Sequence, residues 1–126
     1  MLFVFSTLIW AGCASGNTTA AGTAEEAYRA EGVASYYSDK LHGNTTANGE
    51  VYDRFQLTGA HRELPFGTWL AVTNLDNGKT VEVRINDRGP FVEGRIVDVS
   101  RRAAEQLDFI EKGLTRVRVE EMARVR

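Results

Sequence analysis

The sequence predicts a small, mostly β domain whose sheet closes into a barrel. Short runs of residues alternate between apolar and polar, turn-forming residues separate these runs, and one stretch repeats its apolar residues at helical spacing. The 126 residues, of which 43% are hydrophobic and 25% charged, suit one globular domain. Because five or six short strands would leave unpaired edges in an open sheet, we expect a closed barrel with one or two short helices.

The charge balance and the cysteine content exclude several classes of protein. The 15 basic and 17 acidic residues leave a net charge of −2, and Lys and Arg form no stripe of the kind that binds nucleic acid. Cys13 is the single cysteine, which excludes an intramolecular disulfide and a cysteine-rich metal site. We expect a monomer that binds no nucleic acid and whose fold depends on its own core.

The N-terminal region has the pattern of a secretion signal followed by a tether. Residues 1–10 are almost wholly apolar and lead into small residues before Cys13, a run too short for a bilayer-spanning helix. This pattern resembles a bacterial lipoprotein signal, in which the cysteine is acylated, although Trp10 stands where leucine is usual. An unmodified Cys13 in an ordinary cleaved signal is the alternative. We expect residues 1–13 to be a lipoprotein-type signal and residues 14–31 a flexible tether, with a lipid on Cys13 anchoring the protein in the bacterial envelope, at the outer membrane facing the periplasm.

The first half of the domain combines one strand with polar loops. Residues 25–31 have the composition of a short helical turn, and residues 32–37 alternate as a first strand. Residues 42–50 are rich in turn formers and predict a solvent-exposed loop. Residues 51–60 have no clear period, so we expect mixed turns and a short helix there, before a corner at residues 64–67.

The second half contains the clearest hairpin. Residues 69–73 and 80–85 are strand-like runs, and the Asn77-Gly78 pair between them is a strong turn signal. Residues 95–99 and 115–120 predict two further strands by the same alternation.

One helix is expected between the last two strands. Ser100 is a residue type that caps helix N-termini, and Gly113 stands where a helix C-terminus often ends. One face of this helix would carry the apolar residues Ala103, Ala104, Leu107 and Ile110. The barrel domain then covers residues 32–122, and residues 123–126 form a tail.

The abrupt strand end at residues 84–91 is the place where we expect chemistry. It carries one carboxylate, one amide and two guanidinium groups within five positions. Gly89 and Pro90 cannot continue a strand, so Asp87 lies where the core meets a loop. A carboxylate held on a loop by a rigid strand is a common way to present a catalytic group, although most such loops are only solvated turns.

Read together, the motifs of this domain resemble the rare lipoprotein A family, septal-ring lytic transglycosylases with a double-psi β-barrel fold. The resemblance covers residues 32–121, and Ser38 and Gly59 depart from the residues usual in the family. The segments that carry the resemblance are Gly32-Val33-Ala34-Ser35-Tyr36-Tyr37, Thr46-Ala47-Asn48-Gly49-Glu50, Ala60-His61, Leu64-Pro65-Phe66-Gly67-Thr68, Val72-Thr73-Asn74, Asn77-Gly78, residues 83–91, residues 95–100 and Ala103-Ala104.

The resemblance implies a six-stranded double-psi β-barrel that cleaves peptidoglycan. Asp87 would be the catalytic acid, with Glu50 and His61 beside it in one groove. The enzyme would cut the β-1,4 bond between N-acetylmuramic acid and N-acetylglucosamine and leave 1,6-anhydro-muramic acid ends. The muramic acid 6-hydroxyl would be the nucleophile, so that one group first gives and then takes a proton, without a metal or a cofactor.

Further residues are candidates for contact with the glycan strand. Each lies in one of the motifs named above, most of them close in the sequence to Glu50 or Asp87. They are Tyr36, Thr46, Asn48, Asn86, Arg88 and Phe91. Asp98 has apolar neighbours in its predicted strand, and we interpret it as a structural residue. Two alternatives remain open, namely an expansin-like module that binds polysaccharide without cleaving it, and a glycan hydrolase with two carboxylates.

Overall fold

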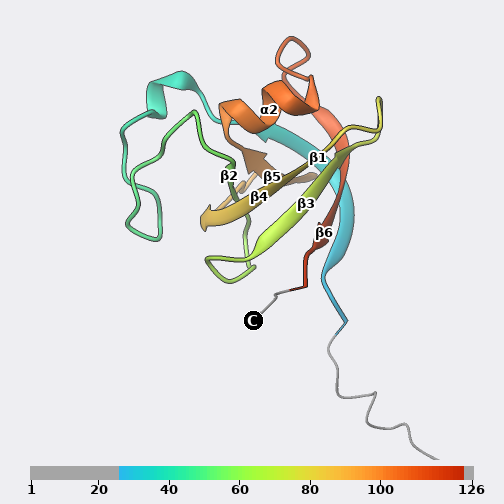
Figure 1. Ribbon diagram of the computed structural model, residues 1–126, viewed down its shortest axis with the longest axis horizontal. Helices are drawn as coiled ribbons and strands as arrows, with labels where there is room; N and C mark the ends of the chain where they lie inside the picture. The colour runs from blue at the N-terminus through green and yellow to red at the C-terminus, as the bar shows by residue number, and fades with distance from the viewer. Residues whose placement is uncertain (1–25, 124–126) are drawn as a thin grey trace, which may run out of the picture.

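The computed structural model describes residues 26–123, and within them six strands form one closed barrel (Figure 1). The order of the strands around the barrel is β1-β5-β2-β4-β3-β6. In chain order the elements are β1 (Arg29–Tyr36), the 3-10 helix η1 (Asp39–Leu41), β2 (Thr58–Ala60), β3 (Trp69–Asn74), β4 (Thr80–Asp87), β5 (Arg95–Val99), α2 (Arg101–Leu107) and β6 (Thr115–Glu121). The prediction of a mostly β, six-stranded barrel with short helices is confirmed.

Two parallel pairs give the barrel its crossed topology. β1 pairs in parallel with β5, and β2 pairs in parallel with β4, whereas the other four neighbouring pairs are antiparallel. Parallel neighbours cannot be joined by a tight turn, so long connections must cross the barrel between them. The longest connection between consecutive strands runs from β1 to β2, which are not neighbours in the barrel, and projects from one side of the barrel in Figure 1.

The barrel interior is filled by the apolar residues of alternating positions. In β4, Val81, Val83 and Ile85 are buried while Glu82 between them is exposed, as expected for a strand with one face on the core. Each fully buried side chain of this size contributes about 1.5–3 kcal/mol relative to exposure. The core residues without any exposed surface include Leu70, Val72, Val83, Ile85, Val97, Val99, Val117 and Val119.

The helix α2 covers one end of the barrel, and the described ends of the chain leave at the other (Figure 1). The predicted cap is confirmed, because the Ser100 hydroxyl accepts a hydrogen bond from the backbone N–H of Ala103. The helix ends earlier than predicted: Asp108 takes the left-handed conformation, with φ of 62°, and its backbone N–H donates to Ala104 and Glu105. Gly113 is therefore not the helix end.

Two expectations about the first half of the domain were wrong. Residues 29–31 are extended rather than helical, because Arg29 pairs with Glu120 and Glu31 with Arg118 in the β1–β6 ladder. Residues 58–60 form strand β2, where a short helix was expected. A strand of three residues with a glycine at its centre is too short to show an alternation of apolar and polar residues. Its pairing with β4 on one side and β5 on the other is what defines it as a strand.

None of the helices among the described residues 26–123 is long and apolar enough to cross a membrane. Cys13, the predicted site of lipidation, lies outside these residues.

Candidate active site

A cavity of about 310 Å³ opens at the end of β4 and holds the predicted acid, Asp87. Strands β1, β2, β4 and β5 all contribute to its wall. The lining residues that bear on chemistry are Tyr36, Tyr37, Ala60, Asp87, Arg88 and Asp98. Two carboxylates and aromatic rings thus share one opening, which is the composition of a site for a polar, ring-shaped ligand.

The two oxygens of the Asp87 carboxylate have different surroundings. Oδ1 accepts hydrogen bonds from the backbone N–H groups of Ala47 and Arg88, each at 2.9 Å. Oδ2 accepts one hydrogen bond, at 2.5 Å, from the hydroxyl of Tyr37. Because Oδ1 already receives two donors that cannot be removed, a proton carried by this carboxyl group must reside on Oδ2.

Tyr37 belongs to a motif that the sequence showed, but the sequence assigned it no catalytic role. Its ring stacks on Tyr52, with centroids 4.4 Å apart and an interplanar angle of 24°. Tyr52 is buried, and its hydroxyl accepts from the backbone N–H of Arg101 at the start of α2. Burial and the hydrogen bond to Asp87 raise the pKa of Tyr37 far above its ordinary value, so this phenol remains a proton donor. The neighbouring Tyr36 also lines the cavity, and its hydroxyl donates to the carbonyl of Ile110 at 2.8 Å.

Thr46 and Asn48 shape the loop that supplies the Ala47 donor. The Thr46 hydroxyl donates to Oδ1 of Asn48 at 2.8 Å, and the same oxygen accepts from the backbone N–H of Glu50 at 3.0 Å. The backbone N–H of Asn48 also donates to the carbonyl of Asn86 in β4. These bonds hold the loop against the end of β4, with the Ala47 N–H directed at Asp87.

Glu50 is bound to residues of β4 other than Asp87. Its two oxygens accept from the guanidinium of Arg84 at 2.8 and 2.9 Å, and the Asn86 and Asn48 amides add bonds of 3.0 and 3.1 Å. The Arg84 hydrogen bonds are the main reason that the pKa of Glu50 falls to about 2. Asn86 is buried, and its Oδ1 has no partner among the described residues. Within residues 26–123, no hydrogen bond joins Glu50 to Asp87.

His61 contacts Asp87 through its backbone and not through its ring. Its N–H donates to the Asp87 carbonyl at 3.2 Å. Its Nδ1 accepts from the backbone N–H groups of Glu63 and Leu64, both at 3.1 Å, which assigns the proton of the neutral ring to Nε2. Burial lowers the pKa of His61, and its ring packs edge-on against Tyr28 at 4.9 Å.

The structure therefore brings the three catalytic candidates to the same end of β4 without joining their side chains. The His61 ring lines a separate cavity of about 90 Å³ that shares no residue with the cavity of Asp87. Among residues 26–123, no group of three or more His, Cys, Asp or Glu residues is arranged to hold a metal ion.

Arg88 and Phe91 lie on the loop that follows β4. The Arg88 guanidinium lies 4.0 Å from the centre of the Phe66 ring and donates to the His61 carbonyl. Phe91 is highly exposed, with 78% of its surface accessible. Arg62 donates to the carbonyls of Pro90, Val92 and Arg95 and so holds this loop beside the cavity.

Asp98, which the sequence suggested is structural, also lines the cavity that holds Asp87. Its Oδ1 accepts from the Ser35 hydroxyl and from the Arg95 guanidinium, the latter at 2.8 Å. Apolar neighbours in the sequence concealed this position, since Val97 and Val99 point into the core from the same strand.

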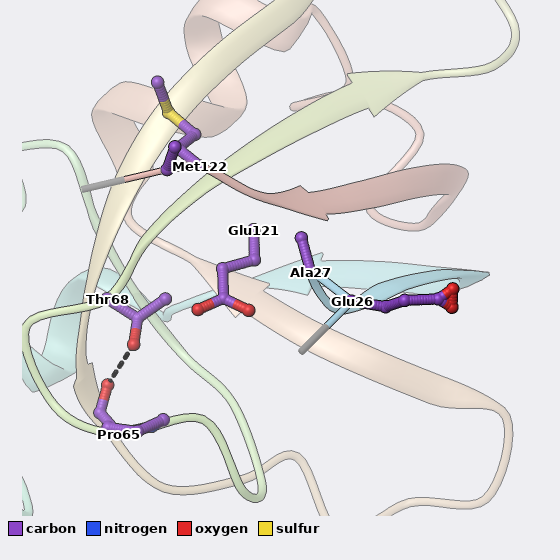
Figure 2. Close-up of a pocket in the computed structure, with 7 residues that line it drawn as sticks. Glu26, Ala27, Pro65, Thr68, Glu121 and Met122 are labelled. Atoms are coloured by element: carbon purple, nitrogen blue, oxygen red, sulfur yellow. Dashed lines mark hydrogen bonds between the residues drawn. The ribbon is translucent and has the colours of Figure 1, made fainter. Parts of the chain in front are cut away.

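A second cavity, of about 320 Å³, lies where the described chain begins and ends (Figure 2). It shares no lining residue with the cavity of Asp87. The Glu121 carboxylate within it accepts from the backbone N–H of Tyr28, and Thr68 donates to the Pro65 carbonyl. The first bond joins the segment before β1 to the end of β6, and the second closes the turn before β3. Because these polar groups bind the chain itself, we place the candidate active site at Asp87.

Comparison with known proteins assigns the chain to a family. A family model described as lytic transglycolase matches residues 29–119. The protein named endolytic peptidoglycan transglycosylase RlpA from Pseudomonas aeruginosa is 54% identical over 94 residues, which are 75% of this chain and 28% of that protein. The protein of the same name from Vibrio cholerae is 49% identical over 89 residues, or 71% of this chain and 34% of that protein. The chain thus spans about a third of the length of the curated relatives it matches.

Solved structures with little sequence similarity share the fold. An expansin from Clavibacter michiganensis has a TM-score of 0.62 at 24% identity and covers 79% of this chain, which corresponds to 52% of the expansin. A papain inhibitor from Streptomyces has a TM-score of 0.62 at 22% identity, covering 76% of this chain and 96% of its own. With its closed barrel and a family match over residues 29–119, the chain belongs to the lytic transglycolase family of double-psi β-barrel domains.

Proposed function

We propose that this domain is an endolytic peptidoglycan lytic transglycosylase. It cleaves the β-1,4 bond between N-acetylmuramic acid and N-acetylglucosamine and leaves 1,6-anhydro-muramic acid ends. The observation that carries this proposal is Asp87, a carboxyl group oriented by three donors at the mouth of a cavity of ligand size. Relatives that are about half identical over this domain are named as enzymes of the same activity, which supports the proposal.

Asp87 carries out both proton transfers in this proposal. Its Oδ2 gives a proton to the glycosidic oxygen as the bond to C1 breaks and positive charge develops on the muramic acid ring. The 6-hydroxyl of the same ring then attacks C1 and returns its proton to Oδ2. A hydroxyl both donates and accepts, so Tyr37 remains hydrogen-bonded to Asp87 before and after each transfer.

Glu50 and His61 act as positioning residues in this mechanism. With a pKa of about 2, Glu50 is ionised near neutral pH and has no proton to give; it holds Arg84 and Asn86 at the strand end. The His61 ring caps the turn that follows β2, and its backbone N–H supports the Asp87 carbonyl. Tyr36, Arg88 and the exposed Phe91 are the side chains best placed to contact sugar rings beside the cavity.

The substrate and the location follow from this activity. Peptidoglycan glycan strands are the partner, and the cell envelope is the compartment where they occur. We propose that a lipid on Cys13 anchors the domain there as a monomer, facing the periplasm. Mass spectrometry of protein extracted from membranes tests the anchor, since an unmodified Cys13 contradicts it.

One observation favours a second function, hydrolysis with two carboxylates. Asp98 lines the same cavity as Asp87, and a hydrolase needs a second carboxylate to activate water. The masses of the products released from purified glycan strands decide between the two reactions. Anhydro products are lighter by one water than hydrolysis products, and a protein that only binds glycan releases none.

A further inference from the structure

The barrel register places Asp87 and Asp98 on either side of one small residue. β2 lies between β4 and β5, and its Ala60 pairs with Asp87 on one side and with Asp98 on the other. Two strand spacings of about 4.8 Å separate the two Cα atoms, so they lie about 10 Å apart. Directly paired residues direct their side chains to the same face of a sheet. Both carboxylates line the cavity, and the Ala60 methyl group leaves room between them.

Asp98 is held with one oxygen engaged and the other without a protein donor. Ser35 and Arg95 both donate to Oδ1, and the Arg95 guanidinium also donates to the Ser35 hydroxyl. Among the described residues, Oδ2 has no hydrogen-bond donor, and 22% of the side chain is accessible at the cavity. Nη2 of Arg95 lies 2.8 Å from Oδ1, so the guanidinium and the carboxylate form an ion pair at the cavity wall.

The Ser35–Arg95–Asp98 cluster is not arranged for stability alone. The Nε of Arg95 is buried and has no partner among residues 26–123. Buried polar atoms without partners are costly, and such costs recur where a protein holds a group for a function. The bonds that do form fix the plane of the carboxylate, with Oδ2 left for a ligand.

We propose that Asp98 is a second catalytic carboxylate, one that stays ionised while Asp87 moves the proton. This rests on the proposed lytic reaction. Asp87 protonates the leaving oxygen, the C1–O bond breaks with its electron pair going to that oxygen, and C1 becomes positively charged. Asp98 stabilises this charge from across the cavity and neither gains nor loses a proton. The 6-hydroxyl then forms the new C1–O6 bond and its proton returns to Asp87, so no second base is required.

The test compares initial rates of the full chain on purified glycan strands. Asp98→Asn keeps the size of the side chain and its bond from Ser35 but removes the charge. We expect kcat to fall by about 30-fold or more and KM to change by less than about threefold, since the charge acts only in the transition state. Asp108→Asn is the matched control; it removes an equally small acid at the end of α2, where Asn also adopts the left-handed conformation.

A double variant separates the charge of Asp98 from its support of Arg95. Asp98→Asn leaves the Arg95 guanidinium without its anion, which lowers stability and could disturb the cavity. Asp98→Asn with Arg95→Gln removes both charges and restores a neutral pair. The proposal expects the double variant to remain slow, with anhydro products; recovery of kcat to within about threefold of the wild type overturns it and assigns Asp98 a structural role.

The outcomes also separate this inference from the proposed function. A wild type that releases anhydro products, with an Asp98→Asn variant of similar kcat, overturns the inference alone. Hydrolysed products from the wild type overturn the lytic reaction, whereas a loss of kcat in Asp98→Asn then still supports a second catalytic carboxylate. A wild type that releases no product overturns both.

Discussion

The hydroxyl of Tyr37 donates to Oδ2 of Asp87 at 2.5 Å, from a ring that is stacked on the buried Tyr52. This contact joins the end of β1 to the end of β4 and leaves Oδ2 as the oxygen available for proton transfer. The stack removes the freedom of the Tyr37 ring, so the carboxyl plane is set before any substrate arrives. Such preorganisation lowers the cost of reaching the reactive geometry.

Tyr37→Phe removes the donor to Oδ2 and retains the aromatic stack. We expect kcat to fall about tenfold, equivalent to about 1.4 kcal/mol, with little change in KM. Initial rates on purified glycan strands, at saturating and at limiting substrate, measure kcat and KM separately. A Tyr28→Phe control, which removes a hydroxyl outside the cavity, should leave both constants unchanged. A kcat for Tyr37→Phe within about twofold of the wild type contradicts the prediction.

Asp87→Asn removes the group that transfers the proton and retains its shape. General acid–base catalysis contributes about 10²–10⁴-fold, so we expect the rate of anhydro product release to fall by at least about 10²-fold. The amide that replaces the carboxylate can still accept the two backbone N–H bonds through its oxygen, so the thermal midpoint should change by only a few degrees. Product release within about tenfold of the wild type, from a variant shown to be folded, contradicts the role of Asp87.

Glu50 should make the stability of the domain depend on pH in the acid range. Its pKa is lowered from 4.5 to about 2, so its contribution is fully present above pH 4.5 and is lost as the pH falls toward 2. The side chain is 40% accessible, and solvent screening reduces the contribution to about 1 kcal/mol. Denaturant unfolding at about pH 7 and about pH 3 measures the free energy of unfolding. The loss is incomplete at pH 3, so in Glu50→Gln the difference between these two values should shrink by roughly half of that amount. An equal difference in both proteins would falsify the assignment.

His61 should stabilise the fold as a neutral, buried ring. Burial lowers its pKa, so its contribution is present above the unfolded pKa of about 6.5 and declines as the pH falls below that value. His61→Ala removes the ring and leaves the backbone N–H groups of Glu63 and Leu64 without their acceptor. We expect a loss of about 2 kcal/mol near neutral pH, measured by denaturant unfolding. A thermal midpoint equal to that of the wild type argues against the capping role.

The local pattern of the chain predicted much of the fold because those features depend on near neighbours. The alternation of Val81, Val83 and Ile85 predicted β4, and Asn77-Gly78 predicted the turn before it. Ser100 predicted the start of α2, since a cap needs only a side chain and a backbone N–H three residues later. The resemblance of the motifs pointed to Asp87, Glu50 and His61, and the structure places all three at one end of β4.

Contacts between strands that are far apart in the sequence could not be predicted from local sequence patterns. β2 has three residues, and a Cβ added at Gly59 would come within 3.0 Å of the Asp98 carbonyl of the neighbouring strand, a tight contact between segments far apart in the sequence. The sequence also could not decide which of two adjacent tyrosines binds Asp87. Tyr36 packs against Phe109, whereas Tyr37, the next residue, donates to Asp87. Glu50 and the His61 ring were expected beside Asp87, but Arg84 and the turn at residues 61–64 bind them instead.

The strand pattern, the capped helix and the strand end that carries Asp87 could all be predicted from the amino-acid order, because each follows from interactions within a few residues. The surroundings of that carboxylate became known only from the folded barrel. Ala60 brings Asp98 to the far wall of the cavity, and Tyr37 reaches Oδ2 from the end of β1. These relations depend on which strands pair and in which register, and pairing across a closed barrel is set by the packing of the whole core rather than by any one segment.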